Sequence, residues 1–142
     1  MADRVLVPVD TSEHARHAVT LALDEFPGAA IMLLHVIDPG EAGFTAGASL
    51  PAFSEDWYAE AEADAEELLE DYAADVSGRG VEVDWAIKVG RPTRVIVEFA
   101  ESEDVDHIVI GSHGREGITR VLLGSVAEAV VRRSPVPVTV TR

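Results

Sequence analysis

Residues 4–37, RVLVPVDTSEHARHAVTLALDEFPGAAIMLLHVI, contain the pattern of a strand, a helix and a second strand. Its β-branched apolar opening predicts a strand over residues 3–9, and the DTS sequence that follows supplies a turn and a helix N-cap. Apolar residues then recur at every third or fourth position over residues 12–26, and the Pro-Gly pair that follows ends the helix. Residues 30–37 are nearly all apolar, as in a central parallel strand that is covered on both faces.

The rest of the chain continues this alternation. Apolar residues trace one face of a long helix from Trp57 to Val76, while acidic residues fill most of its other positions. Residues 81–89 alternate apolar with polar or small residues, which predicts a strand at or near a sheet edge. The remaining predicted elements are helices over residues 92–102 and 125–133 and strands over residues 106–110 and 136–141. Residues 38–54 lack a period and form a loop that is either functional or disordered.

Strands and helices alternate throughout, and this order demands a parallel sheet with helices on both faces. We therefore predict a three-layer, doubly wound α/β fold built on a five-stranded parallel sheet. The 142 residues contain no internal repeat. A domain of this size buries roughly 68 to 70% of the surface of its extended chain, so we expect residues 1–142 to form a single domain.

The charge balance is strongly acidic. Asp and Glu total 26 against 11 Lys and Arg, which gives a formal net charge of −15, and Lys88 is the only lysine. Such a surface repels phosphate backbones and anionic lipid, so we expect neither nucleic acid nor a membrane as a partner. Two interpretations stay open: an ordinary acidic protein, or a halophilic one whose self-repulsion is screened at molar salt, where the Debye length is about 3 Å. The scarcity of lysine favours the halophilic interpretation.

Composition excludes several other classes. The 47% hydrophobic content argues against intrinsic disorder, and no apolar run approaches the ~20 residues of a membrane span. The start MADRVLVPVD lacks the features of a secretory signal, so a cytoplasmic location is expected. The absence of cysteine excludes disulfides, a thiolate nucleophile and cysteine metal sites.

A glycine-rich stretch follows the fourth predicted strand. In GSHGREGITRVLLGSVAEAV, Gly111 is followed after two residues by Gly114 and after nine more by Gly124-Ser125. Glycines after a strand expose backbone N–H groups, and a helix N-terminus adds a positive dipole end, so together they suit two or three phosphates. In the alternative, Ser125 and Glu128 form a capping box and the glycines only shape a turn. Neither a GxGxxG fingerprint nor a GxxxxGK[ST] loop is present.

Several motifs together resemble the universal stress proteins, in particular their ATP-binding, UspA-like subgroup. They are VLVPVDTSEHA, LLHVID, GRP, the G-x2-G-x9-G-S signature and the closing SPVPVTVTR. The resemblance runs over nearly the whole chain and implies strand order 3-2-1-4-5, which agrees with the alternation above. It also implies an ATP site, and Mg²⁺ would then be held only through the phosphates. Members of this family commonly dimerise through the final strand, which implies a homodimer through residues 136–141.

Carried over residue by residue, the resemblance places the nucleotide at the carboxyl ends of the first and fourth strands, where the winding direction reverses. Pro8 and Asp10 would border the nucleoside, and the backbone of Val36 would meet the adenine edge. The residues expected to flank the phosphates or close around them are Gly111, Gly114, Gly124, Ser125 and Val126. Arg115 has two interpretations, as a partner of the polyphosphate or of an acidic helix.

Simpler roles stay open for several residues. Asp10 caps a helix or accepts from the ribose or the base amine, and its place at the winding reversal favours the second role. His14 and His17 lie one helical turn apart without a third ligand, so no metal site is assigned. His35 is expected to be a hydrogen-bonded packing residue. His113 lacks a Ser, Asp or Glu at the spacing of a triad.

Two functions from different classes remain. The first is an ATP-binding regulatory module, in which nucleotide occupancy changes the conformation or the partner surface of a homodimer. The second is a slow ATPase or nucleotidyl-transferring enzyme, which needs a base and a cationic clamp near the terminal phosphate. Only His113 and Arg115 qualify for those roles. We therefore favour the binding module and assign no catalytic residue.

Raising the ionic strength from dilute buffer toward molar KCl should increase the melting temperature. Salt screens the repulsion among carboxylates, above all along residues 60–71, where acidic side chains are dense. Thermal unfolding followed by circular dichroism at stepped KCl concentrations measures the effect. A melting temperature that stays flat or falls over this range contradicts the halophilic interpretation.

Overall fold

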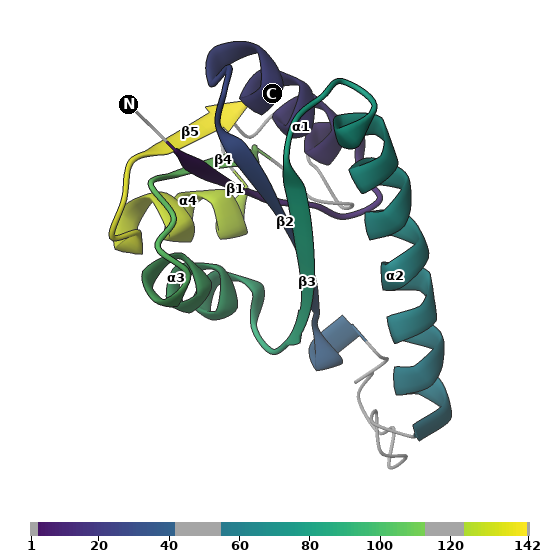
Figure 1. The fold of residues 1–142 in the computed structure, drawn as a ribbon. Coiled ribbons are helices and arrows are strands. Elements are labelled where there is room, and N and C mark those ends of the chain that lie inside the picture. The colour runs from purple at the N-terminus through teal and green to yellow at the C-terminus, as the bar shows by residue number, and fades with distance from the viewer. Residues whose placement is uncertain (1–2, 42–54, 113–123, 142) are drawn as a thin grey trace.

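The computed structural model describes residues 3–41, 55–112 and 124–141 (Figure 1). In chain order its elements are β1 (Arg4–Pro8), α1 (Glu13–Glu25), β2 (Ala30–Ile37), the 3-10 helix η1 (Pro39–Glu41), α2 (Glu55–Ser77), β3 (Val83–Val89), α3 (Pro92–Ser102), β4 (His107–Gly111), α4 (Ser125–Arg133) and β5 (Val138–Thr141). The alternation of strands and helices predicted from periodicity is confirmed.

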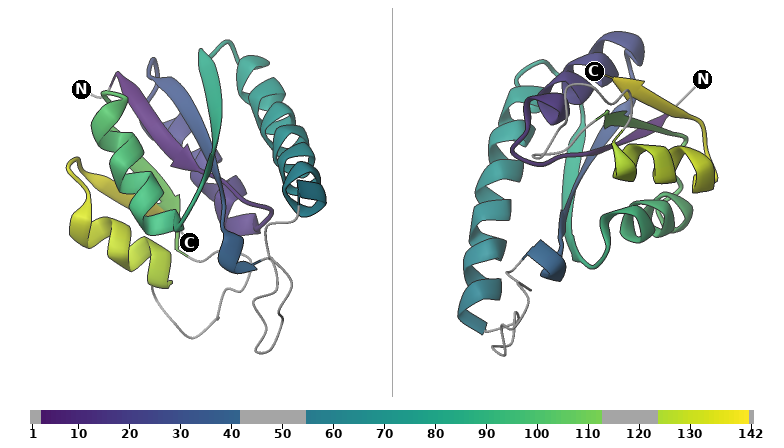
Figure 2. Two further views of the ribbon diagram at one scale, coloured as in Figure 1. Left: turned by 90° about the horizontal axis from the view of Figure 1, so that it is seen from below. Right: turned by 180° about the vertical axis from the view of Figure 1, so that it is seen from behind.

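The five strands form one parallel sheet in the order β3-β2-β1-β4-β5. β1 lies at the centre, where Val5 pairs with Ile31 of β2 on one side and with His107 of β4 on the other. Helices cover both sides of the sheet, α1 and α2 on one face and α3 and α4 on the other (Figure 2). The predicted fold class and the strand order implied by the family resemblance are both confirmed.

Each face of the sheet has its own apolar core. Successive residues of a strand point to opposite faces, so Val5 and Val7 pack beneath α1 and α2 while Leu6 packs on the side of α3 and α4. Leu69 and Val76 of the long acidic helix α2 are fully buried in the first core. Because both cores close around the middle of the sheet, the strand ends are the positions left for a ligand.

The last strand is shorter than predicted. The sequence suggested a strand over residues 136–141 that includes Pro137, whereas β5 begins at Val138. The Ser134 hydroxyl explains the difference, because it donates to the Val136 carbonyl at 2.6 Å and accepts from the Val136 N–H at 3.0 Å. These bonds close a turn before the strand, and Pro137 contributes only its carbonyl to the pairing with β4.

The start of α4 settles one of the open alternatives. Gly124 is the N-cap, with extended backbone, and Ser125 is the first helical residue. A capping box with Glu128 requires Ser125 at the N-cap, so that interpretation is wrong. Glu128 instead donates its backbone N–H to the Gly124 carbonyl at 2.9 Å, and its carboxylate pairs with Arg132 at 3.2 Å.

An exposed carboxylate fastens the start of β1 to the start of β4. Asp106 accepts from the backbone N–H groups of Asp3 and Arg4, both at 2.9 Å. The Arg4 guanidinium donates in turn to the Glu103 carbonyl at 2.7 Å. The two backbone hydrogen bonds hold the pKa of Asp106 below its ordinary value, because they stabilise the charged form.

Replacing Asp106 with Asn should lower the free energy of unfolding at neutral pH, because the amide keeps one acceptor oxygen but loses the charge. The contribution of the carboxylate is present above the ordinary pKa of aspartate and is lost as the pH falls through its lowered pKa in the folded protein. The gap between the two proteins should therefore shrink from about pH 7 to about pH 3. Urea unfolding at both pH values measures this gap, with Asp104→Asn as the matched control. A gap of equal size at both pH values would contradict the assignment.

Candidate functional site

The chain winds in opposite directions from the two central strands, and the reversal lies at their carboxyl ends. β1 continues through α1 to β2, whereas β4 continues through α4 to β5 on the other side of the sheet. Open parallel sheets bind their ligands at such a reversal. The residues that end β1 and β4 and those that begin α1 and α4 therefore form the candidate site.

Asp10 follows β1 and organises the start of α1. Its Oδ1 accepts from the backbone N–H of Ser12 at 2.8 Å and also from the Ser12 hydroxyl. Ser12 is the N-cap of α1, since its side chain accepts from the N–H of Ala15 at 3.2 Å. Asp10 thus supports the helix cap through one carboxylate oxygen, while Oδ2 takes no part in these bonds.

Gly111 ends β4 beneath the first turn of α1. A Cβ atom at this position would lie 2.7 Å from the Cβ of His14 and 2.8 Å from its carbonyl carbon and oxygen, which is closer than such atoms pack. Gly111 is buried, so no solvent-filled space is available to relieve the contact. The residue has a packing role that does not depend on any ligand, because it lets α1 rest directly on β4.

One backbone hydrogen bond brings the start of α4 to the end of β4, and a second joins the end of β4 to β5. Ser112, which is 1% exposed, donates its N–H to the Thr141 carbonyl at 2.7 Å. Its own carbonyl accepts from the N–H of Gly124 at 2.5 Å. Ser125 is exposed, and Val126 packs against the core beneath α3 and α4. An anion at this end of α4 would meet the positive end of the helix dipole.

Val36 of β2 lies beyond Leu34, the last residue of β2 that is paired with β1. The N–H of Ile31 donates to the Glu82 carbonyl at 2.9 Å, so the odd-numbered residues of β2 bond to β3 and Val36 faces the β1 side. On that side the pairing ends where the Val9 N–H donates to the Leu34 carbonyl at 2.8 Å. Within the described residues, Val36 makes no backbone hydrogen bond beyond this point.

Two residues at the strand ends have structural roles. His35 places its Nδ1 2.8 Å from the Val9 carbonyl oxygen, which confirms the prediction of a hydrogen-bonded packing residue. Pro8 is half-buried and stands opposite Leu34 at the last paired position of β1. Both residues shape the edge of the sheet beside Asp10.

The structure brings most of the predicted binding residues to the carboxyl ends of the strands. Those that it places at the carboxyl ends of the strands or at the start of α4 are Pro8, Asp10, Val36, Gly111, Gly124, Ser125 and Val126. Gly114, Arg115 and His113 lie outside the described residues. Sequence reasoning missed Ser112, although its position directly after Gly111 in the glycine signature was a signal for it.

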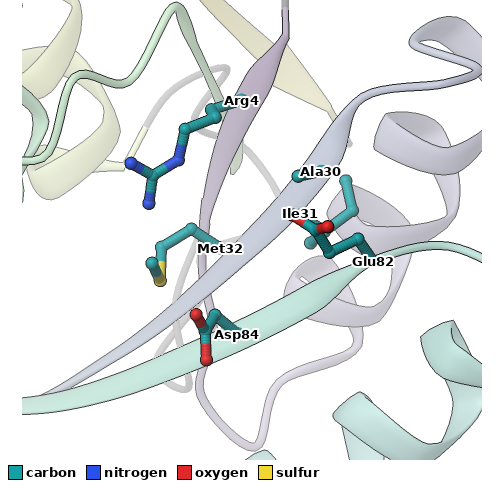
Figure 3. A pocket seen from close by; sticks show the side chains of 6 residues that line it. All are labelled: Arg4, Ala30, Ile31, Met32, Glu82 and Asp84. Carbon is teal, nitrogen blue, oxygen red and sulfur yellow. The ribbon is translucent and has the colours of Figure 1, made fainter.

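The cavity in Figure 3 lies at the amino ends of the strands, away from the candidate site at their carboxyl ends. Its volume is about 300 Å³, and its lining residues are Arg4, Ala30, Ile31, Met32, Glu82 and Asp84. These residues belong to the amino ends of β1 and β2 and to the start of β3, so the cavity is not the candidate site. In residues 3–41, 55–112 and 124–141, no group of three or more His, Asp or Glu side chains is placed to hold a metal ion. None of the described helices is long and apolar enough to span a membrane.

Comparisons with known proteins agree with this arrangement. The sequence profile of the Universal stress protein family matches residues 1–142. Universal stress protein MJ0577 from Methanocaldococcus jannaschii is 32% identical over 157 residues, which cover 100% of this chain and 96% of that protein. The solved structure of MJ0577 has a TM-score of 0.86 and 33% identity, covering 98% of this chain and 94% of its own.

Two further solved structures are similar. UspA from Lactobacillus plantarum has a TM-score of 0.82 at 31% identity and covers 98% of this chain and 97% of its own. The universal stress protein from Archaeoglobus fulgidus, solved in complex with dAMP, shares the fold with a TM-score of 0.70 at 24% identity, covering 98% and 97% of the two chains. The profile match and the near-complete coverage of these relatives show that the chain belongs to the universal stress protein family.

Proposed function

We propose that this chain is an ATP-binding stress-response module whose nucleotide lies at the carboxyl ends of β1 and β4. The observation that carries the proposal is the hydrogen bond of 2.5 Å from Gly124 to Ser112, which anchors the first turn of α4 beside the end of β4. Phosphate suits that position because helix N-termini attract anions. The relative from A. fulgidus that was solved with dAMP supports an adenine nucleotide as the ligand class.

The nucleoside is assigned to the ends of β1 and β2. The outward N–H and C=O of Val36 offer one donor and one acceptor, as the edge of adenine requires. Asp10 uses Oδ1 to support Ser12, which leaves Oδ2 to accept from a ribose hydroxyl. Pro8 contributes shape at the end of β1.

The phosphates are assigned to the glycine signature. Gly111 brings α1 onto the end of β4, and the cradle itself would consist of Gly114, Gly124, Ser125 and Val126. Arg115 is assigned to the charge of the polyphosphate, and Mg²⁺ would be held through the phosphate oxygens. Nucleotide occupancy then changes the conformation or the partner surface of a homodimer. As part of the same proposal, the protein is cytoplasmic, and its net charge of −15 supports adaptation to high salt.

Replacing Gly124 with Val should weaken ATP binding about tenfold, equivalent to about 1.4 kcal/mol. The branched side chain would obstruct the first turn of α4, whereas the extended backbone of this N-cap accepts valine. Calorimetric titration with ATP, AMP and GTP in high-salt buffer measures the effect. Gly78→Val, at the exposed position directly after α2, is the matched control and should bind like the parent protein.

Retained far-UV circular dichroism separates a loss of binding from unfolding. Unchanged ATP affinity in folded Gly124→Val would overturn the phosphate assignment. Multiple-turnover hydrolysis at about 1 per second or faster would favour an enzyme over a binding module. Gly111 is unsuitable as a binding probe, because any side chain there collides with His14.

We further propose a homodimer formed through residues 136–141. β5 is an edge strand, and Val138 and Val140 are only half-buried against the core beneath α3 and α4. Val131, on the helix α4 that contacts β5, is 45% exposed and adds apolar surface to this part of the molecule. Proteins normally cover or pair such an edge. Pro137 restricts the contact to a short antiparallel segment with side-chain packing.

Changing Val138 and Val140 together to Glu should dissociate this dimer, because like charges from two subunits would meet at the contact. Sedimentation at high salt and roughly 50 μM protein measures the mass. Val131→Glu is a second variant at a position whose exposure tolerates a charge. Ala63→Glu combined with Ala74→Glu, on exposed positions of α2, is the charge-matched control. A monomeric parent, or charged variants that remain dimeric, would place the interface elsewhere.

A further inference from the structure

The outer side of β3, at the other edge of the sheet, has features that the proposed function does not use. Among the described residues β3 pairs with β2 alone, over seven residues in unbroken register. It contains no proline, whereas Pro137 directly precedes the four-residue strand β5 at the opposite edge. A long edge without proline is a template for pairing with another strand.

The N–H and C=O groups of every second residue of β3 point away from β2, toward the open edge of the sheet. Glu82 accepts from the N–H of Ile31 at 2.9 Å, and the N–H of Gly90 donates to the Ile37 carbonyl at 3.0 Å. These bonds show that the even-numbered residues along β3 face β2. The residues whose N–H and C=O groups point outward are therefore Val83, Trp85, Ile87 and Val89.

Two opposite charges flank the middle of this strand. Asp84 and Lys88 are both exposed, on the face away from α2, and Ala86 lies between them. Four strand residues span about 13 Å, so the two side chains cannot pair with each other. Within the described residues, the salt bridges of α3 (Arg94–Glu98) and α4 (Arg132–Glu128) involve neither of them.

Arg4 is the cation that shares a cavity with Asp84. Figure 3 shows the two side chains on the same side of the sheet, with Met32 between them. Arg4 lies two strands away, on β1, and its guanidinium donates to the Glu103 carbonyl at 2.7 Å. The carboxylate of Asp84 thus remains available at the edge.

We propose that β3 pairs with β3 of a second copy of this chain, antiparallel about a two-fold axis at Ala86. Asp84 then lies opposite Lys88 of the partner subunit, and Lys88 lies opposite the partner's Asp84. Both are non-hydrogen-bonded positions, where facing Cα atoms are about 4.5 Å apart and side chains are closest. The order of acid, alanine and base is complementary to itself, and this symmetry identifies a second copy as the partner.

The same register also pairs the outward backbone groups of β3 and covers apolar side chains on its α2 face. Odd-numbered residues meet odd-numbered residues, so Trp85 exchanges hydrogen bonds with Ile87 of the partner subunit. Val89, which is 40% exposed, is covered by the partner's Val83. A pairing shifted by one residue would set outward backbone groups against inward ones. A shift by two would move the axis off Ala86 and separate the charges.

The charge of the whole chain opposes this contact. Each copy carries a net charge of −15, and α2 exposes acidic side chains beside β3, so repulsion must be screened before the strands meet. At about 0.5 M KCl the Debye length is about 4 Å, which screens distant carboxylates more than charges in contact. The association is therefore weak in dilute buffer and stronger in salt. It does not depend on nucleotide binding, and it uses the opposite edge from β5.

Cysteine cross-linking tests the register, because the chain has no cysteine of its own. Ala86→Cys places two thiols at the axis, and mild oxidation at about 0.5 M KCl should convert most of the protein to a covalent dimer. Asp84→Cys and Lys88→Cys are matched controls. Each of their thiols is about 13 Å from its symmetry mate, beyond the roughly 7 Å Cα separation that a disulfide spans. Both controls should cross-link several-fold more slowly.

Charge reversal in the Ala86→Cys background tests the complementarity. Asp84→Lys sets like charges opposite each other and should slow cross-linking about tenfold. It also makes the chain less negative, so nonspecific repulsion alone would predict faster linking. Adding Lys88→Asp restores opposite pairs and should restore the rate, which a merely structural defect would not allow.

Circular dichroism confirms that each variant is folded. The proposal is overturned if Ala86→Cys links no faster than Asp84→Cys and Lys88→Cys. It is equally overturned if the double reversal links no faster than Asp84→Lys alone. These outcomes are independent of the β5 contact, because only residues of β3 carry the thiols and the reversed charges.

Discussion

The close contact between α1 and the end of β4 determines where the neighbouring elements meet. His14 lies so close to Gly111 that no side chain fits between the helix and the strand. Asp10 and Ser12 belong to the same constraint, because their hydrogen bonds fix where α1 begins. With α1 seated in this way, the carboxyl ends of β1 and β4 open beside the start of α4. The position of the candidate site follows from this packing.

On so acidic a chain, the phosphate site proposed above depends on donors other than lysine. The candidate site supplies them from the main chain, through the first turn of α4 and the open backbone of Val36. Backbone N–H groups and a helix dipole act at short range, so they remain effective within a negative overall field. In the proposed site, the acidic surface and the main-chain donors are thus contributed by different atoms. This separation makes an acidic surface compatible with the proposed phosphate site.

Periodicity predicted the elements because each one buries a face within its own segment. The strand order came from the family resemblance, since local periodicity says nothing about which strands become neighbours. The error at the start of β5 is local, because the Ser134 side chain closes a turn at Val136. Other features were not predicted because distant residues decide them. Gly124 caps α4 because it is bonded to Ser112, and Asp106 reaches Asp3 across a separation of 103 residues. Gly111 was predicted for a ligand, and its packing against His14 was visible only in three dimensions.

The pairing of β1 with β4, which is synthesised much later, affects how the chain folds during protein synthesis. Val5 pairs with His107, so the centre of the sheet forms only after β4 has left the ribosome. Until α3, β4 and α4 have emerged, the side of the sheet that carries Leu6 and Leu34 stays uncovered. Contacts between distant segments form slowly, and apolar surface that waits for them promotes aggregation. The nascent chain therefore stays prone to aggregation until these elements have emerged and packed on the sheet.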